Sequence, residues 1–307
     1  MTFPLFDLHC DTAFEMEKCG QGLTENSLAI SLSGAKIISP YVQVMAIWTP
    51  QTLSDEEGWQ AFHRVYRHLT DDLTIRNRKV VFGEYAPESD RPNLLLSVED
   101  GRIIGKDLSR LDTLHVLGVK IFTPFWAGEN VLGGAHDTDK GLSPFGRVAL
   151  QKALDLGMIL DLSHASVPSA REILSLAETA ERPAIASHSN SYDLCQASRN
   201  LHREELQRII ACGGLVGLNL HKPFLRTNDD ATMDDLLRQI DYFLENGAEN
   251  NLALGGDLDG CKPIPEIQKV ENYAFLWERL EREGFPIDLI EALFFGNASR
   301  FAERYFT

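Results

Sequence analysis

The chain has 307 residues, of which 44% are hydrophobic and 24% are charged, a composition typical of a globular protein with a sizeable core. Its formal net charge of −16 is spread along the chain, which disfavours binding to nucleic acid or to an anionic membrane. The five cysteines form no CxxC pair, no signal peptide precedes the first strand, and no run approaches the ~18 apolar residues of a membrane span. These features predict a cytoplasmic protein.

The first predicted strand is an apolar run that begins at Phe3 and ends in His9 and Asp11. Because alternate residues of a strand lie on the same face, His9 and Asp11 can point at one ion together. If one strand carries such a pair at its carboxyl end, other strands of the same sheet should bring further ligands there. A polar, glycine-containing stretch then extends to about Ser39, and the next strand is predicted at 41–48.

The rest of the chain alternates between short apolar strands and helices. Ser54 and Glu57 have the spacing of a capping box, which predicts a helix that runs to about Arg76. A glycine-rich loop of ~20 residues follows the strand at 119–123, and loops of this length are often functional. The remaining strands are predicted at 93–98, 119–123, 158–163, 183–187, 214–220 and 252–256, and the remaining helices at 107–117, 146–156, 168–178, 203–212, 232–246, 271–283 and 287–305.

This order of elements predicts an α/β fold, a closed (β/α)8 barrel of the TIM type. Near-continuous apolar strands are buried on both faces, as in a parallel sheet covered by helices. Eight such strands, most of them followed by a helix, suggest a closed barrel. A doubly wound open sheet is the alternative, but no glycine-rich nucleotide-binding fingerprint follows the first strand. No linker or change of composition divides the chain, so we predict one domain over residues 1–307.

Potential metal ligands stand at the carboxyl ends of five predicted strands, which form one face of such a barrel. A single histidine after a strand is more often a turn or core residue than a ligand, but the repetition at successive strand ends favours a metal site. Imidazole and carboxylate groups suit zinc and related ions, and six groups suit two ions ~3.5–4 Å apart with a bidentate bridge such as Glu99. The six residues are His9, Asp11, Glu99, His164, His188 and Asp257.

Six short motifs occur in a fixed order along the chain: His-Cys-Asp-Thr, Ser-Val-Glu-Asp-Gly, Gly-Leu-Ser-Pro-Phe-Gly, Asp-Leu-Ser-His-Ala-Ser, Ser-His-Ser and Gly-Gly-Asp-Leu-Asp-Gly. From about residue 5 to 300, this series resembles the renal (membrane) dipeptidase family, peptidase family M19 of the amidohydrolase superfamily. The resemblance implies a barrel of the metal-dependent hydrolase type that binds two Zn²⁺ ions. It further implies that His9 and Asp11 hold one zinc, that His164 and His188 hold the other, and that Glu99 bridges them.

The resemblance also implies a catalytic role for Asp257, at the end of the eighth strand. This carboxylate would accept the proton of the metal-bridging water and pass it to the departing amine, with Asp259 as the alternative. Arg199, in Ala-Ser-Arg-Asn, matches the family's arginine that contacts the substrate carboxylate. A guanidinium offers two parallel donors to such a group, although without the resemblance a surface loop arginine would be the favoured interpretation.

The sequence departs from the family pattern at Trp126, where the best-studied members carry a histidine that stabilises the oxyanion. An indole N–H donates one hydrogen bond but cannot carry a positive charge. We predict that Trp126 and Asn130 line the substrate pocket, with simple loop packing as the alternative, and that His221 contacts the substrate. His136 in the same loop could supply a cation by closing over the site, whereas a loop histidine is usually just solvated.

Together these expectations describe a cytoplasmic zinc dipeptidase that acts on dipeptides through a metal-bridging hydroxide. Its partner would be a small-molecule substrate. Members of the family are often dimers, so the resemblance also makes a homodimer possible. The fold and the ligands leave open another binuclear amidohydrolase, such as an N-acyl-amino-acid deacylase, a lactonase or a phosphotriesterase. A binding protein on a barrel that has lost its activity is the alternative from a different class. The residues preferred on either side of the bond, and the choice between L,D- and L,L-dipeptides, are left open.

Overall fold

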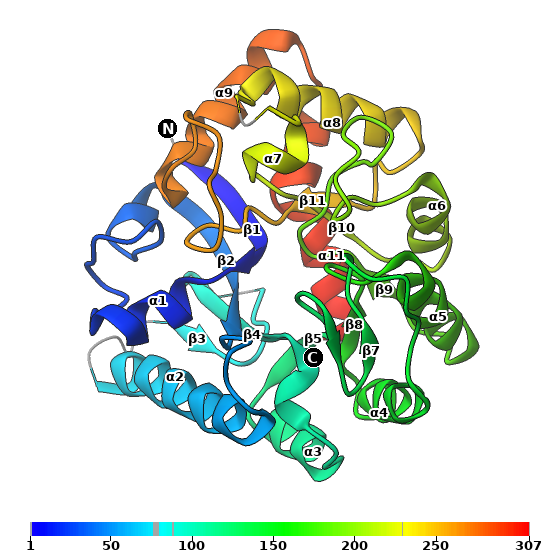
Figure 1. Cartoon of the computed structure of the whole chain (residues 1–307). Coiled ribbons are helices and arrows are strands. Elements are labelled where there is room, and N and C mark those ends of the chain that lie inside the picture. Colours follow the sequence, from blue (N-terminus) through cyan, green and yellow to red (C-terminus); the bar gives the residue numbers. More distant parts are fainter. Residues whose placement is uncertain (1, 76–79, 88, 229, 307) are drawn as a thin grey trace.

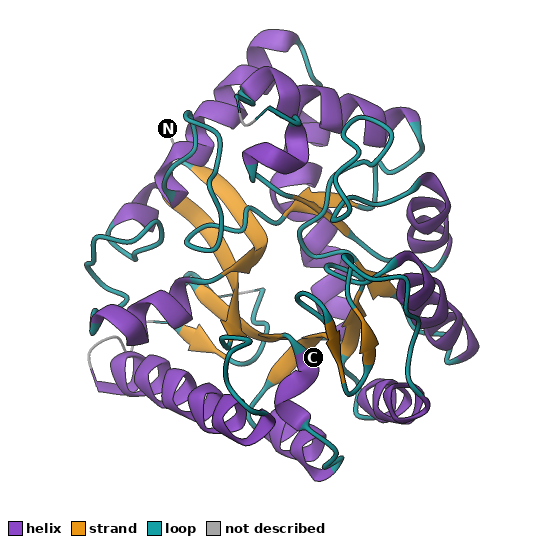
Figure 2. Ribbon diagram, viewed as in Figure 1, coloured by secondary structure: helices purple, strands orange, loops and turns teal. Residues whose placement is uncertain are grey.

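Parallel strands curve into a barrel whose outside is covered by helices (Figure 1, Figure 2), because the strands are apolar on both faces and both faces are buried. The computed structural model describes residues 2–75, 80–87, 89–228 and 230–306. Within these residues, neighbouring strands of the barrel follow one another in sequence order. The barrel strands are β1 (Phe3–Cys10), β2 (Ile38–Trp48), β4 (Asn93–Glu99), β5 (Val119–Thr123), β8 (Ile159–Asp161), β9 (Ala184–Ile185), β10 (Val216–Leu218) and β11 (Leu252–Leu254).

The barrel closes between β9 and β10. Ala186, the residue after β9, forms a parallel bridge with Val216, and its backbone N–H donates to the carbonyl oxygen of Leu215 at 2.9 Å. Gly217 allows this close approach, because a Cβ at its position would lie 1.9 Å from the carbonyl oxygen of Ser187. The closure brings the carboxyl ends of all the barrel strands to one face. The predicted TIM barrel is therefore confirmed.

Helix α11 (Asn297–Tyr305) closes the amino-terminal end of the barrel. Phe6 and Leu8 of β1 form one apolar cluster with inward-facing residues of the other strands, and Phe301 of α11 belongs to the same cluster. The Asn297 side chain donates to the carbonyl oxygen of Leu252 at 2.7 Å, at the start of β11. Figure 1 shows α11, in red, behind the strands. The opposite end, where the strands finish, is left for a functional site.

The outer helices follow the predicted alternation with the strands. The predicted capping box is present, because the Ser54 hydroxyl accepts the Glu57 N–H while the Glu57 carboxylate accepts the Ser54 N–H at 2.9 Å. The predicted end of this helix, Arg76, lies outside the described residues. No described helix combines the length and apolar character needed to cross a bilayer. The outer helices are α2 (Asp55–Ile75), α3 (Ser109–Val116), α4 (Pro144–Asp155), α5 (Val167–Thr179), α6 (Arg203–Ala211), α8 (Met233–Glu245), α9 (Tyr273–Glu283) and α10 (Ile287–Glu291).

Several short elements differ from the prediction. Helix α1 (Thr12–Cys19) begins directly after Asp11, in the polar, glycine-containing stretch where no helix was predicted. Its buried face is narrow, with Thr12, Ala13 and Met16 alone, so it gives a weak helical pattern. The helix predicted over 287–305 is divided by a π-helical turn at Ala292–Gly296. The other additions are strand β3 (Val81–Phe82) beside β4, a hairpin of β6 (Glu129–Asn130) and β7 (Gly133–Gly134), helix α7 (Lys222–Leu225), and 3-10 turns at Gly34–Ile37, Gly101–Ile104 and Val270–Asn272.

Candidate metal centre

The carboxyl end of the barrel gathers six buried or nearly buried imidazole and carboxylate side chains from the ends of five strands. Ligand atoms of His9, Glu99 and His188 lie within 4.8 Å of one another. The same holds for ligand atoms of His9, Asp11 and Asp257. The structure thus brings together all the predicted metal-site residues, which are His9, Asp11, Glu99, His164, His188 and Asp257.

His9 and Asp11 form one side of the centre, at the end of β1. The buried Asp7 carboxylate fixes this strand end, because it accepts the His9 backbone N–H at 2.9 Å and the Tyr273 hydroxyl at 2.6 Å. His9 Nε2 and Asp11 Oδ2 are 3.5 Å apart, which is long for a hydrogen bond. Among the described residues, neither His9 Nε2 nor Asp11 Oδ1 has a hydrogen-bond partner although both are buried. Such orphaned atoms are rare in folded proteins, and they fit a cation between them.

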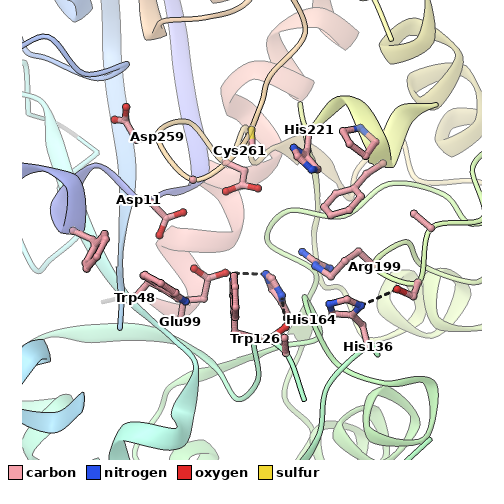
Figure 3. Close-up of a pocket in the computed structure, with 18 of the residues that line it drawn as sticks. Asp11, Trp48, Glu99, Trp126, His136, His164, Arg199, His221, Asp259 and Cys261 are labelled. Carbon is pink, nitrogen blue, oxygen red and sulfur yellow. Dashed lines mark hydrogen bonds and ion pairs between the residues drawn. The ribbon is translucent and has the colours of Figure 1, made fainter. Parts of the chain in front are cut away.

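Glu99, the last residue of β4, lies between the two groups of ligands. Its Oε2 is 3.6 Å from His9 Nε2, whereas its Oε1 is 2.9 Å from His164 Nε2 and 3.5 Å from His188 Nε2. Figure 3 shows Glu99 between Asp11 and His164. Burial alone would raise the pKa of Glu99, but the positive charge of His9 holds it well below its usual range. An ionised carboxylate with each oxygen facing different ligands has the form of a bridge between two cations.

The two histidines on the far side of Glu99 have fixed tautomers. His164 Nδ1 lies 2.7 Å from the carbonyl oxygen of Trp126, and because a carbonyl only accepts, Nδ1 carries the proton. Burial lowers the pKa of His164 and lowers that of His188 still further, so both imidazoles are neutral near pH 7. Their Nε2 atoms are 3.0 Å apart. Two nitrogen lone pairs this close repel each other, and a shared cation removes the repulsion.

A buried carboxylate, Asp161, sets the tautomer of His188. Its Oδ1 accepts the backbone N–H groups of Ser163 and Ser187 at 2.9 Å, and its Oδ2 accepts the Thr123 hydroxyl at 2.8 Å. The Ser187 hydroxyl also donates to Asp161 Oδ2, at 2.5 Å, and its oxygen lies 2.8 Å from His188 Nδ1. Since the serine proton is already donated, His188 Nδ1 must be the donor. The Nε2 atom of His188 is therefore left unprotonated and turned toward Glu99.

Asp257 follows β11 and faces His9 across the centre. One of its carboxylate oxygens lies 3.9 Å from His9 Nε2, and the other accepts a hydrogen bond from the Asn219 side chain at 3.1 Å. Its backbone has φ 58°, and that of His164 has φ 67°, so both lie in the left-handed region. Burial raises the pKa of Asp257 from 3.8 to about 6, although the attraction of His9 opposes the shift. A carboxylate with a pKa near neutrality is suited to exchange a proton.

The raised pKa of Asp257 predicts how the stability of the metal-free protein depends on pH. In the unfolded chain Asp257 has a pKa of 3.8, whereas in the folded chain its pKa is about 6. Between these two pH values the folded chain therefore keeps a proton on Asp257 that the unfolded chain has already released. We therefore expect the free energy of unfolding to fall more steeply between these pH values in the wild type than in Asp257→Asn. Urea titrations of both metal-free proteins measure the difference, and equal slopes would contradict the raised pKa.

The centre opens into a cavity of about 510 Å³, a size that suits a small molecule. Arg199 lies in its wall (Figure 3), with its guanidinium 5.4 Å from the centre of the Phe224 ring. Its Nη2 donates to the carbonyl oxygen of His188 at 3.3 Å, whereas its Nε is buried and has no partner in the described part of the chain. Burial lowers the pKa of Arg199 to about 10, so it stays charged at neutral pH. The charged guanidinium lines the cavity, so it can bind a carboxylate that enters there.

Trp126 and His221 also line the cavity. The Trp126 ring is 5.2 Å from the Trp48 ring and 6.2 Å from the His164 ring. Its backbone carbonyl holds His164, so Trp126 supports the centre through its main chain as well as facing the cavity. His221 Nδ1 accepts the backbone N–H of Lys262 at 3.0 Å, which orients the imidazole at the cavity mouth.

Two loop residues have surroundings that differ from the expectation. His136 lines the cavity with its Nδ1 2.8 Å from Ser198 Oγ, and burial lowers its pKa to about 4. In this conformation it is therefore neutral at pH 7. Asn130, on β6, is not among the described residues that line the cavity. Its side-chain amide donates to Asp100 Oδ1 and to the carbonyl oxygen of Pro124, both at 2.9 Å, so Asn130 fastens the hairpin to the barrel.

Sequence reasoning missed the residues that support the ligands from behind. Asp7 and Asp161 are acids within apolar strands, and Asn219 directly follows one. A polar residue in an apolar strand is the signal that could have identified them, because a buried polar group needs a hydrogen-bond partner. Which partner each one finds depends on the register of neighbouring strands, which a single sequence does not reveal. Phe14 and Trp48 also line the cavity, and no motif in the sequence indicates this position for either residue.

Comparisons with known proteins agree with this architecture. A model of the membrane dipeptidase family, peptidase family M19, matches residues 1–305. An uncharacterized protein encoded in the pqqA 5′ region of Klebsiella pneumoniae is 30% identical over 205 residues, which are 63% of this chain and 73% of that protein. An uncharacterized dipeptidase of Schizosaccharomyces pombe is 30% identical over 212 residues, which are 65% of this chain but only 50% of that protein.

The fold is also similar to that of a solved metallo peptidase from Rhodobacter sphaeroides, whose structure contains a phosphinate mimic of the dipeptide L-Ala-D-Ala. The TM-score is 0.92 at 22% identity, and the match covers 99% of this chain and 100% of that chain. At 22% identity, this similarity shows a shared fold. The family model, in contrast, matches residues 1–305, a range that includes all six residues of the centre. The chain therefore belongs to the membrane dipeptidase family, peptidase family M19.

Proposed function

We propose that this protein is a binuclear zinc dipeptidase. The observation that carries the proposal is the position of Glu99, whose two oxygens face His9 on one side and His164 on the other. Membership of a metallopeptidase family supports a metal cofactor. The donor set of imidazoles and carboxylates suits zinc, and the orphaned His9 Nε2 and Asp11 Oδ1 fit a bound ion.

Five side chains would hold the metal, with Asp257 next to them. His9 and Asp11 would bind one ion, His164 and His188 the other, and Glu99 would bridge the two. When bound, zinc would lower the pKa of the attacking water and polarise the scissile carbonyl. The hydrogen bonds that fix the His164 and His188 tautomers support this role, because each leaves Nε2 free to bind a metal.

The remaining steps belong to side chains that face the cavity. Asp257 would accept the proton of the attacking water and deliver it to the departing amine, and its pKa of about 6 suits both transfers. Arg199 would bind the carboxylate of the substrate through its guanidinium, which lines the cavity. Trp126 and His221 would contact the substrate. We propose that the protein acts in the cytoplasm on small-molecule dipeptides, and that it needs neither nucleic acid nor membrane.

A substrate panel tests the proposed function directly. The zinc-loaded protein should hydrolyse dipeptides, including L,L and L,D pairs, and should retain about two zinc ions per chain after dialysis. N-acylated amino acids, lactones and organophosphates in the same panel represent the other reactions of binuclear barrels. Hydrolysis of one of those classes without hydrolysis of dipeptides would replace the proposal. The absence of both metal and hydrolysis would favour a binding protein.

Arg199→Ala is expected to raise KM for dipeptides by about 10- to 100-fold, because a hydrogen-bonded ion pair with the substrate carboxylate is lost. Zinc content should stay at the wild-type value, since Arg199 is not a ligand. Arg203→Ala is the matched control, because Arg203 is an exposed arginine that pairs with Asp193 at 3.4 Å. Steady-state kinetics and metal analysis of both variants provide the comparison. An unchanged KM in Arg199→Ala would remove Arg199 from the binding site.

A further inference from the structure

Three aromatic rings from separate elements form one side of the cavity, and we call Phe14, Trp48 and Trp126 the aromatic wall. Phe14 belongs to α1, Trp48 ends β2, and Trp126 lies in the loop after β5. The Phe14 and Trp48 rings meet edge to face at 4.9 Å, and the Trp48 and Trp126 rings are 5.2 Å apart. All three side chains line the cavity and are only partly buried. The aromatic wall therefore presents apolar surface that a ligand can cover.

The direction of a bound dipeptide follows from the proposed function, on which this inference rests. Its carboxylate would lie at Arg199 and its scissile bond at the metal ligands. Figure 3 shows Trp48 on one side of Glu99 and Arg199 on the other. The amino-terminal residue, on the far side of the scissile bond from the carboxylate, would consequently extend toward the aromatic wall.

The acids near the aromatic wall are already paired. Glu15 accepts the Lys18 ammonium at 2.7 Å. Asp259 accepts the Thr12 hydroxyl at 2.6 Å through one oxygen and the Ala29 backbone N–H at 2.7 Å through the other. These pairings occupy both oxygens of Asp259 and place a positive charge beside Glu15, which weakens both acids as partners of a cationic side chain. The chemistry offered beside the rings is apolar, so a large apolar group gains more there than a charged or small one.

We infer that the aromatic wall is the subsite for the side chain of the amino-terminal residue of the substrate, and that it selects large apolar or aromatic side chains. Trp126 then has a defined contribution, because its indole extends the apolar surface from Trp48 toward His164. The amino-terminal residue of the dipeptide would thus determine which substrates the protein prefers.

The wild-type protein tests the inference without any substitution. In the series Phe-Ala, Leu-Ala, Ala-Ala, Gly-Ala, Lys-Ala and Asp-Ala, kcat/KM for Phe-Ala and Leu-Ala should exceed that for Gly-Ala by at least about 10-fold. The reverse series, with Ala first and the second residue varied, should show a smaller spread. A preference for Lys-Ala, for Gly-Ala, or for an aromatic second residue would overturn the inference, as would equal rates for all. Failure to hydrolyse any dipeptide would overturn the proposed function together with it.

Variants then assign the preference to the rings. The preference is measured as kcat/KM for Phe-Ala divided by kcat/KM for Gly-Ala. Trp48→Ala should lower this ratio by about 10-fold. Trp48→Leu should lower it less, because leucine keeps more of the apolar surface. The ratio cancels any general loss of activity, and zinc content checks that the centre is intact. Phe224→Leu is the control, because Phe224 lies beside Arg199 on the carboxylate side and should leave this ratio unchanged. An unaltered ratio in both Trp48 variants, or an equal fall in Phe224→Leu, would overturn the assignment.

Discussion

Asp257→Asn is expected to lower kcat for dipeptides by about 10³-fold while zinc stays bound. The asparagine side chain has the same shape and can still contact Asn219, but it can neither accept nor deliver a proton. Its backbone also suits the site, because asparagine tolerates the left-handed conformation with φ 58° that Asp257 adopts. Steady-state kinetics with metal analysis on the same preparation measures both quantities. A kcat within about 10-fold of the wild type would remove Asp257 from the proton transfer.

Asp259→Asn is the matched control for this variant. Asp259 also lines the cavity, but its two oxygens are occupied by Thr12 and by the backbone of Ala29. We expect its turnover to stay close to that of the wild type. If Asp259→Asn instead lost activity as severely as Asp257→Asn, the two carboxylates would share the role, and a pH profile of each variant would separate them.

Glu99→Gln is expected to abolish tight binding of the second zinc ion and to reduce turnover to background. An amide offers one weakly coordinating oxygen, whereas a bridge needs two anionic oxygens. Removing a residue that only hydrogen-bonds to a metal ligand typically lowers metal affinity or activity by roughly 10–100-fold, and we expect a larger loss for Glu99→Gln. The neutral side chain also removes a negative charge from a buried cluster that contains Asp11 and Asp257. Zinc content after dialysis, and the gain in thermal stability on adding zinc, measure the effect.

Glu15→Gln provides the comparison, because Glu15 lines the same cavity but pairs with Lys18 on α1. It should bind two zinc ions and show the wild-type gain in stability. Two zinc ions retained with near wild-type affinity in Glu99→Gln would show that Glu99 is not a bridge. One ion retained with full turnover would show that a single metal is sufficient.

The barrel could be predicted because its strands carry their signal locally. The predicted strand 119–123 coincides with β5, and each apolar run is bounded by polar residues that turn the chain. Once eight parallel strands are assumed, their carboxyl ends must converge, and His164 and His188 come together without any knowledge of loops. The same reasoning places Glu99 near His9, because both residues lie at the carboxyl ends of their strands.

Features that depend on distant partners could not be predicted. β9 contains only Ala184–Ile185, and the barrel closes there through Ala186 and Val216, which are far apart in the sequence. Asn130 lies in the loop that borders the cavity, but the register of the β6–β7 hairpin turns its amide toward Asp100 and away from the substrate side. The hydrogen bonds of Asp161 likewise join three strands, and no local pattern indicates them.

The left-handed backbone at His164 and Asp257 limits how this protein can be engineered for heat resistance. A residue with a Cβ loses roughly 1–2 kcal/mol in that conformation, whereas glycine adopts it freely and asparagine at smaller cost. A library screened only for chains that survive heating should therefore enrich glycine and asparagine at these two positions, and each enriched clone would lack an essential group of the centre. Thermostable variants that remain enzymes have to be selected for turnover in the same round, with stabilising changes sought on the outer helices instead.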